Sequence, residues 1–120
     1  DHTRSWRLLC DFDGEGQGIR DHFVDRPRFD AWAKAYAARL AREGSVREER
    51  RARMRAVNPR YVLRNWLAQR AIERAESGDF SEVRALHSIL RRPFDDQDVD
   101  PSYDAEPPDD QRHLVVSCSS

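Results

Sequence analysis

The spacing of apolar residues at intervals of three and four is the feature that most constrains the fold of this chain. It recurs in three stretches, which begin near Pro27, Asn58 and Asp79. Residues spaced in this way lie on one face of an α-helix. Apolar residues make up only 38% of the chain and charged residues 36%, so we expect two-sided helices with apolar surface that needs an external partner. The pattern predicts an all-α module of about four helices.

The first long helix is expected from Pro27 onward. A stripe of large side chains runs along it, namely Phe29, Trp32, Tyr36 and Leu40. Gly44 can end this helix. Ser45 and Glu48 have the spacing of a capping box, which predicts a second helix through Val57. Because arginine and glutamate dominate that second helix, we expect it to be solvated or packed across a charged surface.

The segment 58–69 carries the clearest helix signal. Asn58 can cap the free backbone donors of a first turn, and Pro59 is preset for the first helical position. One broad apolar face follows, made of Val62, Leu63, Trp66, Leu67, Ile72 and Ala75. The arginines of this segment fall mostly elsewhere, as expected for a helix with one buried face.

A short turn separates this helix from the next one. Gly78 can close the first helix in a left-handed conformation, and Asp79 with Glu82 can open the second. The inner side of the second helix carries Phe80, Val83, Leu86, Ile89 and Leu90, and Pro93 ends it. So short a connection predicts an antiparallel helix pair at the centre of the module.

We divide the chain into three parts. Residues 1–24 are an irregular lead-in with a short helix through Trp6 to Cys10 and a glycine-rich loop. Residues 25–94 are the helical domain. Residues 95–120 are an extended acidic tail that ends in Ser-Cys-Ser-Ser, with Tyr103 as its expected anchor. Residues 113–116 are a short β-prone run, which could add to a sheet edge elsewhere in the protein.

Charge is distributed unevenly along the chain. The net charge is only −1, which gives no overall field to attract nucleic acid. Between Arg39 and Arg74 there are eleven arginines and four glutamates, and between Asp95 and Asp110 there are eight acids and no base. We expect the two blocks to attract each other. Since arginine suits phosphate, an Arg-rich helical module that binds nucleic acid or an acidic protein is the alternative function, although salt bridges within the protein are favoured.

Catalytic and metal-binding patterns are weak. The histidines lie at 2, 22, 87 and 113, without the i, i+4 spacing of a helical zinc site. We expect His87 to be partly buried with one hydrogen bond, and Asp95 with Asp96 to be solvated charge. Gly14, Gly16 and Gly18 suggest a phosphate-binding loop, but no apolar strand precedes them and no lysine follows, so we interpret them as a flexible loop.

The two cysteines have different surroundings in the sequence. They are too few for a disulfide scaffold, and the sequence shows neither a signal peptide nor a membrane-length apolar run, so a reducing, cytoplasmic compartment is expected. Cys10 follows two leucines and is interpreted as a packing residue. Cys118 lies among small hydroxyl residues and is either an idle exposed thiol or a redox switch. A Cys10–Cys118 bridge is a further alternative.

Several separate segments of the chain resemble the C-terminal region of the selenoprotein O family. These segments are 19–26, 29–32, 58–69, 75–80, 92–94 and the closing 117–120. The resemblance implies a bacterial, kinase-like enzyme that binds ATP with Mg or Mn and adds AMP to serine, threonine or tyrosine of other proteins. It also implies that the catalytic, ATP-binding and metal-binding residues lie in a body that precedes Asp1. Consistent with this, the chain opens without a methionine, and we expect it to be a fragment that is inactive alone.

The family resemblance assigns one functional residue to this segment. Cys118 matches a position that holds selenocysteine in some members and cysteine in others. The resemblance therefore implies a redox role for Cys118, through a disulfide bond to a cysteine of the catalytic body. The expected partners are that kinase-like body and the substrate proteins, without a membrane and without nucleic acid.

Overall fold

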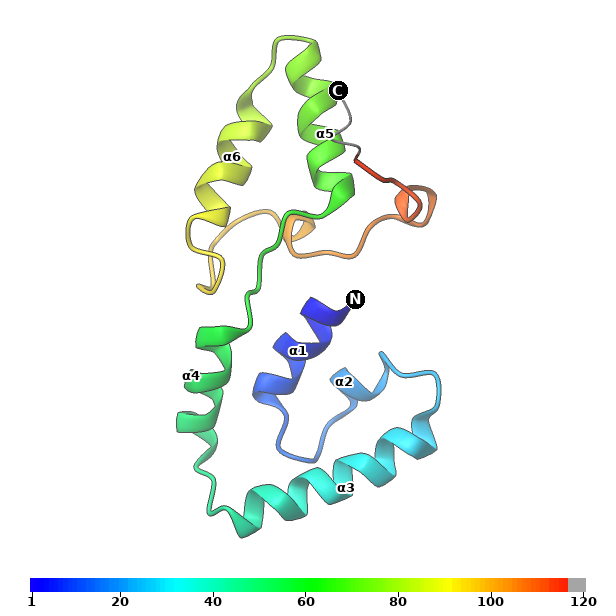
Figure 1. Ribbon diagram of the computed structural model, residues 1–120, viewed down its shortest axis with the longest axis vertical. Helices are drawn as coiled ribbons and strands as arrows, with labels where there is room; N and C mark the ends of the chain where they lie inside the picture. Colours follow the sequence, from blue (N-terminus) through cyan, green and yellow to red (C-terminus); the bar gives the residue numbers. More distant parts are fainter. Residues whose placement is uncertain (117–120) are drawn as a thin grey trace. The chain divides into compact units, whose positions relative to one another are not determined.

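The computed structural model describes residues 1–116, and within them every regular element is helical (Figure 1). The helices are α1 (His2–Asp11), α2 (Gln17–Arg20), α3 (Arg26–Arg42), α4 (Arg47–Val57), α5 (Asn65–Glu76) and α6 (Ser81–Leu90), followed by the 3₁₀ turns η1 (Pro101–Tyr103) and η2 (Asp109–Gln111). The predicted all-α fold is confirmed. The chain forms two compact units, one ending at Pro59 and the other beginning at Arg60. This boundary falls inside the expected helical domain 25–94.

The first unit contains α1 to α4 around a small aromatic and aliphatic core. Asp1 caps α1 by accepting a hydrogen bond from the backbone N–H of Arg4 at 3.1 Å, and Asp25 caps α3 in the same way through Arg28 at 3.0 Å. Such carboxylate caps satisfy backbone donors that have no partner inside the helix. The core residues are Leu9, Phe12, Ile19, Phe29 and Ala33. This core joins α1, α2 and α3.

Two glycines shape the first unit. Gly44 ends α3 with φ of +60°, and the backbone N–H groups of Gly44 and Ser45 donate to Ala41 and Leu40, which is the Schellman arrangement. Gly14 has φ of +109°, and a Cβ atom at this position would collide with the Cβ of Ala37. The glycine-rich loop therefore packs closely on α3.

The predicted capping box at the start of α4 is wrong. Val46 occupies the N-cap position of α4, and no side chain caps the helix. Ser45 instead accepts a hydrogen bond from Nη1 of Arg50 at 2.9 Å. Arg50 is buried, and a buried guanidinium requires acceptors close to it. The Ser45 hydroxyl is therefore a hydrogen-bond acceptor for the buried Arg50 side chain and does not cap the helix.

The predicted helix start at Asn58 is also wrong, because Asn58 ends α4. Its backbone, with φ of −112° and ψ of 103°, has the extended conformation that a following proline favours. The backbone N–H groups of Arg60 and Tyr61 both donate to the carbonyl of Pro93, at 2.8 and 3.1 Å. Tyr61 is only 2% exposed. These two hydrogen bonds, to a residue far away in the sequence, hold the segment after Pro59 extended. The helix α5 therefore begins only at Asn65.

The second unit is built on the predicted antiparallel pair of α5 and α6, which is confirmed (Figure 1). Gly78 has φ of +87°, and the N–H groups of Gly78 and Asp79 donate to the carbonyls of Ala75 and Arg74 at 2.9 Å each. The core contains Trp66, Leu67, Ala71 and Leu86, with Leu90, Tyr103 and Leu114 packed against it. Tyr103 thus anchors the tail, as predicted.

Candidate functional site

The cysteine predicted to carry chemistry, Cys118, lies outside the described residues. The tail that leads to it is described as far as residue 116. The side-chain amide of Asn65 donates to the carbonyl of Leu114 at 3.0 Å, and the Leu114 side chain packs on the core of the second unit. The tail is therefore fixed four residues before Cys118.

Cys10 is a buried packing residue, as predicted. Its side chain is 0% exposed, and Sγ donates to the carbonyl of Trp6 at 3.3 Å. Burial raises the pKa of the Cys10 thiol above its ordinary value, and Asp11 adds to the shift while Arg7 opposes it. Because the thiolate is the reactive form, this sulfur is poorly suited to exchange chemistry.

The arginines of α4 bind carboxylates of the same unit. Arg51 contacts Oδ1 of Asp11 at 2.5 Å, and Arg55 contacts Oδ2 of the same residue at 2.8 Å. Arg47 contacts Asp13 at 2.9 Å. These pairs are the intramolecular salt bridges that the sequence favoured over nucleic-acid contacts. The predicted attraction to the acidic block is seen in the second unit, at Arg60 (Nη1 to Asp96 Oδ1, 3.0 Å; Nε to Asp104 Oδ2, 2.9 Å).

A buried carboxylate in the second unit was misassigned from the sequence. Glu82 is 4% exposed and does not act as a capping residue for α6. Its Oε1 accepts from Nε of Arg70 at 3.0 Å, and its Oε2 accepts from Nη1 of Arg74 at 2.9 Å. The i, i+4 spacing of the two arginines on α5 was the available sequence signal, because residues so spaced share a helix face.

Arg70 also links the helix pair to the tail. Its guanidinium lies 5.2 Å from the ring centroids of both Trp66 and Tyr103, a cation–π arrangement on two faces. Burial, with the neighbouring Glu82 carboxylate, raises the pKa of the Tyr103 hydroxyl. The side chains around Arg70 contact one another across α5, α6 and the tail. This arrangement is suited to holding the tail on the helix pair.

Two observations on the described residues bear on the binding of a metal ion or a phosphate group. Within 1–116, no group of three or more His, Cys, Asp or Glu side chains could hold a metal ion. In the glycine-rich loop region, Arg20 is bound by both carboxylate oxygens of Asp30, at 2.7 and 2.9 Å. His87 is exposed on α6, so its predicted partial burial is wrong. We assign no residue of this range to AMP transfer.

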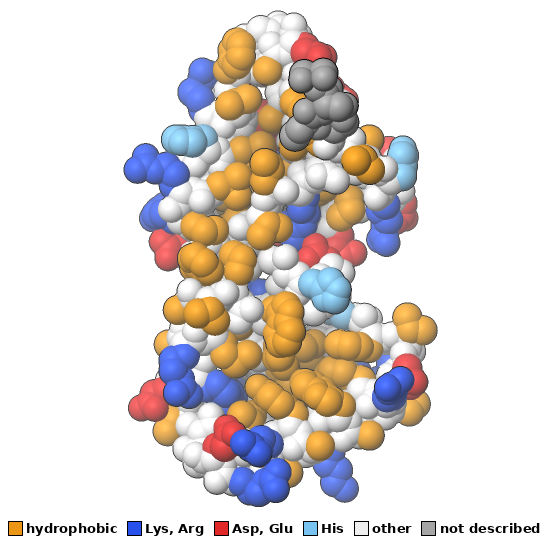
Figure 2. Space-filling view, in the orientation of Figure 1, with side chains coloured by type: hydrophobic (Ala, Val, Ile, Leu, Met, Phe, Trp, Pro, Cys, Tyr) orange, Lys and Arg blue, Asp and Glu red, His pale blue; other side chains and the backbone are white. Residues whose placement is uncertain are grey.

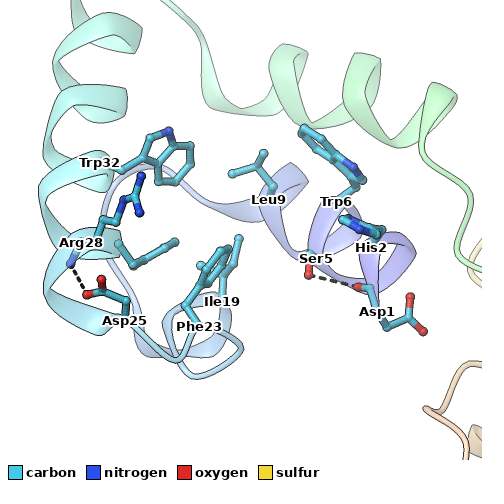
Figure 3. A pocket seen from close by; sticks show the side chains of 11 residues that line it. Asp1, His2, Ser5, Trp6, Leu9, Ile19, Phe23, Asp25, Arg28 and Trp32 are labelled. Atoms are coloured by element: carbon cyan, nitrogen blue, oxygen red, sulfur yellow. Dashed lines mark hydrogen bonds between the residues drawn. The ribbon is translucent and has the colours of Figure 1, made fainter. Parts of the chain in front are cut away.

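An apolar hollow of about 670 Å³ lies on the first unit. Its walls come from α1, from α2 with the segment that follows it, and from α3 (Figure 3). The apolar lining residues are Trp6, Leu9, Ile19, Phe23, Phe29 and Trp32. Figure 2 shows hydrophobic side chains gathered on this face of the unit. The hollow is a candidate binding surface within the described residues, and nothing in the sequence pattern predicted it.

None of the helices described in residues 1–116 combines the length and apolar character required to cross a membrane.

Comparison with known proteins identifies relatives over most of the chain. The family model for protein adenylyltransferase SelO matches residues 10–91. The protein nucleotidyltransferase YdiU of Pseudomonas aeruginosa PAO1 is 58% identical over 102 residues, which cover 85% of this chain and 21% of that protein. The proteins of the same name from Pseudomonas fluorescens Pf0-1 and Enterobacter sp. 638 are 56% and 50% identical, each over 100% of this chain and 25% of the relative. The chain thus spans about a fifth to a quarter of these relatives' length.

Proposed function

The chain belongs to the SelO family of protein adenylyltransferases, and from this premise we propose that it is the C-terminal helical segment of such an enzyme. The full-length protein would transfer AMP from ATP to serine, threonine or tyrosine of other proteins. The observation that carries this proposal is the family match over residues 10–91, together with identities of 50 to 58% to proteins named nucleotidyltransferases.

The role proposed for this segment is to brace the catalytic body. ATP and Mg or Mn would be held by residues in the remaining part of the protein, which amounts to about three quarters of the length of the relatives. The segment supplies two units with cores of their own. It also supplies apolar surface beyond those cores, which is suited to packing against another part of the protein. We expect a cytoplasmic location.

Cys118 is proposed to regulate the enzyme through a reversible disulfide bond. Its sulfur would join that of a cysteine in the catalytic body, while two electrons and two protons pass to a disulfide or peroxide oxidant. The support is the resemblance at the closing Ser-Cys-Ser-Ser segment and the attachment of the tail at Leu114. Mass spectrometry of the unreduced full-length protein, beside a Cys118→Ser variant, identifies the bridged peptides.

The activity itself is tested with the full-length protein, ATP, Mg or Mn, and a mixture of bacterial proteins. We expect AMP adducts on serine, threonine or tyrosine peptides, detected by mass spectrometry. The 120-residue chain under the same conditions should give none. Absence of adducts with the full-length protein, or robust transfer by the short chain, would contradict the proposal.

A further inference from the structure

We propose that the apolar hollow on the first unit is the docking surface for an apolar segment of the same polypeptide that lies outside these 120 residues. The inference deepens the proposed bracing role and rests on it, because it assumes that the chain is one part of a longer protein. It assigns the contact to a defined surface, formed by Trp6, Phe23 and Trp32 around a buried floor.

Three half-exposed aromatic side chains lie close together at the hollow. Trp6 is 53% exposed, Phe23 42% and Trp32 43%, and all three line the same hollow (Figure 3). Single exposed apolar residues are ordinary on protein surfaces, whereas a concave group of large aromatics marks a binding surface. Their convergence on one hollow is therefore the observation that points to an occupant.

The walls of the hollow are already in place for binding. The ring of Phe23 stacks on that of Phe29 at a centroid distance of 4.7 Å, and Trp32 lies 5.5 Å from Phe29 and 5.0 Å from Tyr36. Phe29 is buried in the core, so it fixes the rings that lean on it. A surface held in this way loses little conformational freedom when it is covered.

The polar groups at the rim favour an apolar occupant. The Asp25 carboxylate accepts from the backbone N–H of Arg28 at 3.0 Å, and the Ser5 hydroxyl donates to the backbone carbonyl of Asp1 at 3.1 Å (Figure 3). The Asp25 and Ser5 groups are bound within their own helix ends, while the side chains of His2 and Arg28 also line the hollow and make its rim partly polar. Sites for small polar ligands instead place several polar groups so that they converge on the ligand. The chemistry offered to an occupant is thus mainly apolar and aromatic.

The rest of the same polypeptide is the best-suited occupant. About three quarters of the length of the relatives lies outside the matched region, so in the proposed full-length enzyme a long stretch of sequence would be covalently attached to this unit. Attachment gives such a segment a high effective concentration at the hollow. A second copy or a separate protein would have to overcome the loss of translational and rotational freedom on association. The contact at the hollow is therefore intramolecular in this proposal.

Hydroxyl-radical footprinting of the purified full-length protein tests the contact. Phe23 and Phe94 provide a matched pair, since both are phenylalanines with 42% exposure in this chain, and Phe94 does not line the hollow. Covering Phe23 to the 5% exposure of Phe29 would lower its reactive surface about eightfold. We expect Phe23 to be oxidised severalfold more slowly than Phe94, and equal oxidation of the two residues would overturn the proposal.

Two further measurements identify the occupant. Protection of Phe23 should persist over a hundredfold dilution of the purified protein, because an intramolecular contact does not depend on concentration. Protection that disappears on dilution would assign the hollow to a second copy, and protection that requires added protein or small molecule would assign it to a separate partner. Either result overturns the proposal.

Substitution gives an independent measurement. In the Phe23→Ser variant of the full-length protein, Trp32 on the opposite wall of the hollow should be oxidised faster than in the unsubstituted protein, whereas Val24→Ser, at a fully exposed neighbour outside the hollow, should leave the oxidation rate of Trp32 unchanged. Equal effects would count against docking. AMP transfer is assayed separately in the same samples, so loss of the proposed activity with Phe23 still protected would refute the function and leave the docking surface standing.

Discussion

At the scale of single residues, Glu82 shows why a spacing that satisfies a local rule can serve a different purpose. Asp79 and Glu82 match the capping box at the start of α6, yet the Glu82 carboxylate lies buried between Arg70 and Arg74 of α5. A buried carboxylate is stable only when cations and donors surround it. The Glu82 carboxylate is placed where it can bind Arg70, twelve residues earlier in the chain. A short sequence window around Glu82 does not include this partner.

The first prediction concerns this carboxylate. Glu82→Gln keeps the shape of the side chain and removes its charge, so the two arginines lose their shared anion. We expect the free energy of unfolding to fall by about 1–3 kcal/mol, because both arginines keep partial access to water. Urea denaturation measures the change. Glu76→Gln, which removes the same charge from an exposed position on α5, is the control and should have little effect.

A second prediction concerns the dependence of stability on pH. Hydrogen bonds from the side chain and backbone of Ser81 hold the pKa of Asp79 below its ordinary 3.8. A carboxyl group with a lowered pKa stabilises the fold while it is ionised, so its contribution is complete above pH 3.8 and is lost as the pH falls through the lower folded value. Asp79→Asn should therefore flatten the acid limb of the stability profile. An acid limb identical to that of the unsubstituted protein would contradict this explanation.

Burial of individual residues was predictable where the surrounding sequence is apolar. Cys10 follows Leu8 and Leu9 on one helix, and its complete burial was expected from that neighbourhood. His87 has similar apolar neighbours in sequence but lies on the outer side of α6. Neighbours at i±1 point to other faces of a helix, so an apolar neighbour such as Leu86 does not determine whether His87 is buried.

At the scale of elements, periodicity predicted which helices exist, and glycine predicted where two of them end. Gly44 and Gly78 both adopt positive φ at the ends of α3 and α5, as residues without a Cβ atom can do at low cost. The start of α5 was not predictable from Asn58 and Pro59. The backbone of the following residues is bound to Pro93 in the same unit, and this tertiary contact overrides a local capping signal.

The third prediction tests the turn between α5 and α6. At Gly78, φ is +87° and no atom lies within 4 Å of an added Cβ, so an alanine would meet conformational strain without a collision. Gly78→Ala should lower the free energy of unfolding by roughly 1–2 kcal/mol. Gly18 offers the matched control, since it has equal space and no positive φ. Thermal or urea unfolding that ranks Gly18→Ala as the more damaging exchange would contradict this explanation.

At the scale of the whole molecule, each unit has its own core, and the tail belongs to the second one. Arg60 contacts Asp96 and Asp104, and Asn65 holds Leu114. The sequence indicated the attraction between the basic and acidic blocks, but not which residues would carry it. The apolar hollow was likewise missed, because its lining residues come from three separate segments that only the fold brings together.

The last prediction follows from the attachment of the tail. In the proposed disulfide, the attachment of the tail at Leu114 would raise the effective concentration of the Cys118 thiol near a partner thiol in the catalytic body. Leu114→Ser should release the tail from the core of the second unit and slow formation of the Cys118 disulfide in the full-length protein. Val115→Ser is the control, because Val115 is adjacent in sequence and 81% exposed. The rate is followed by trapping free thiols during oxidation with oxidised glutathione, and equal rates for the two variants would show that the attachment at Leu114 does not position Cys118.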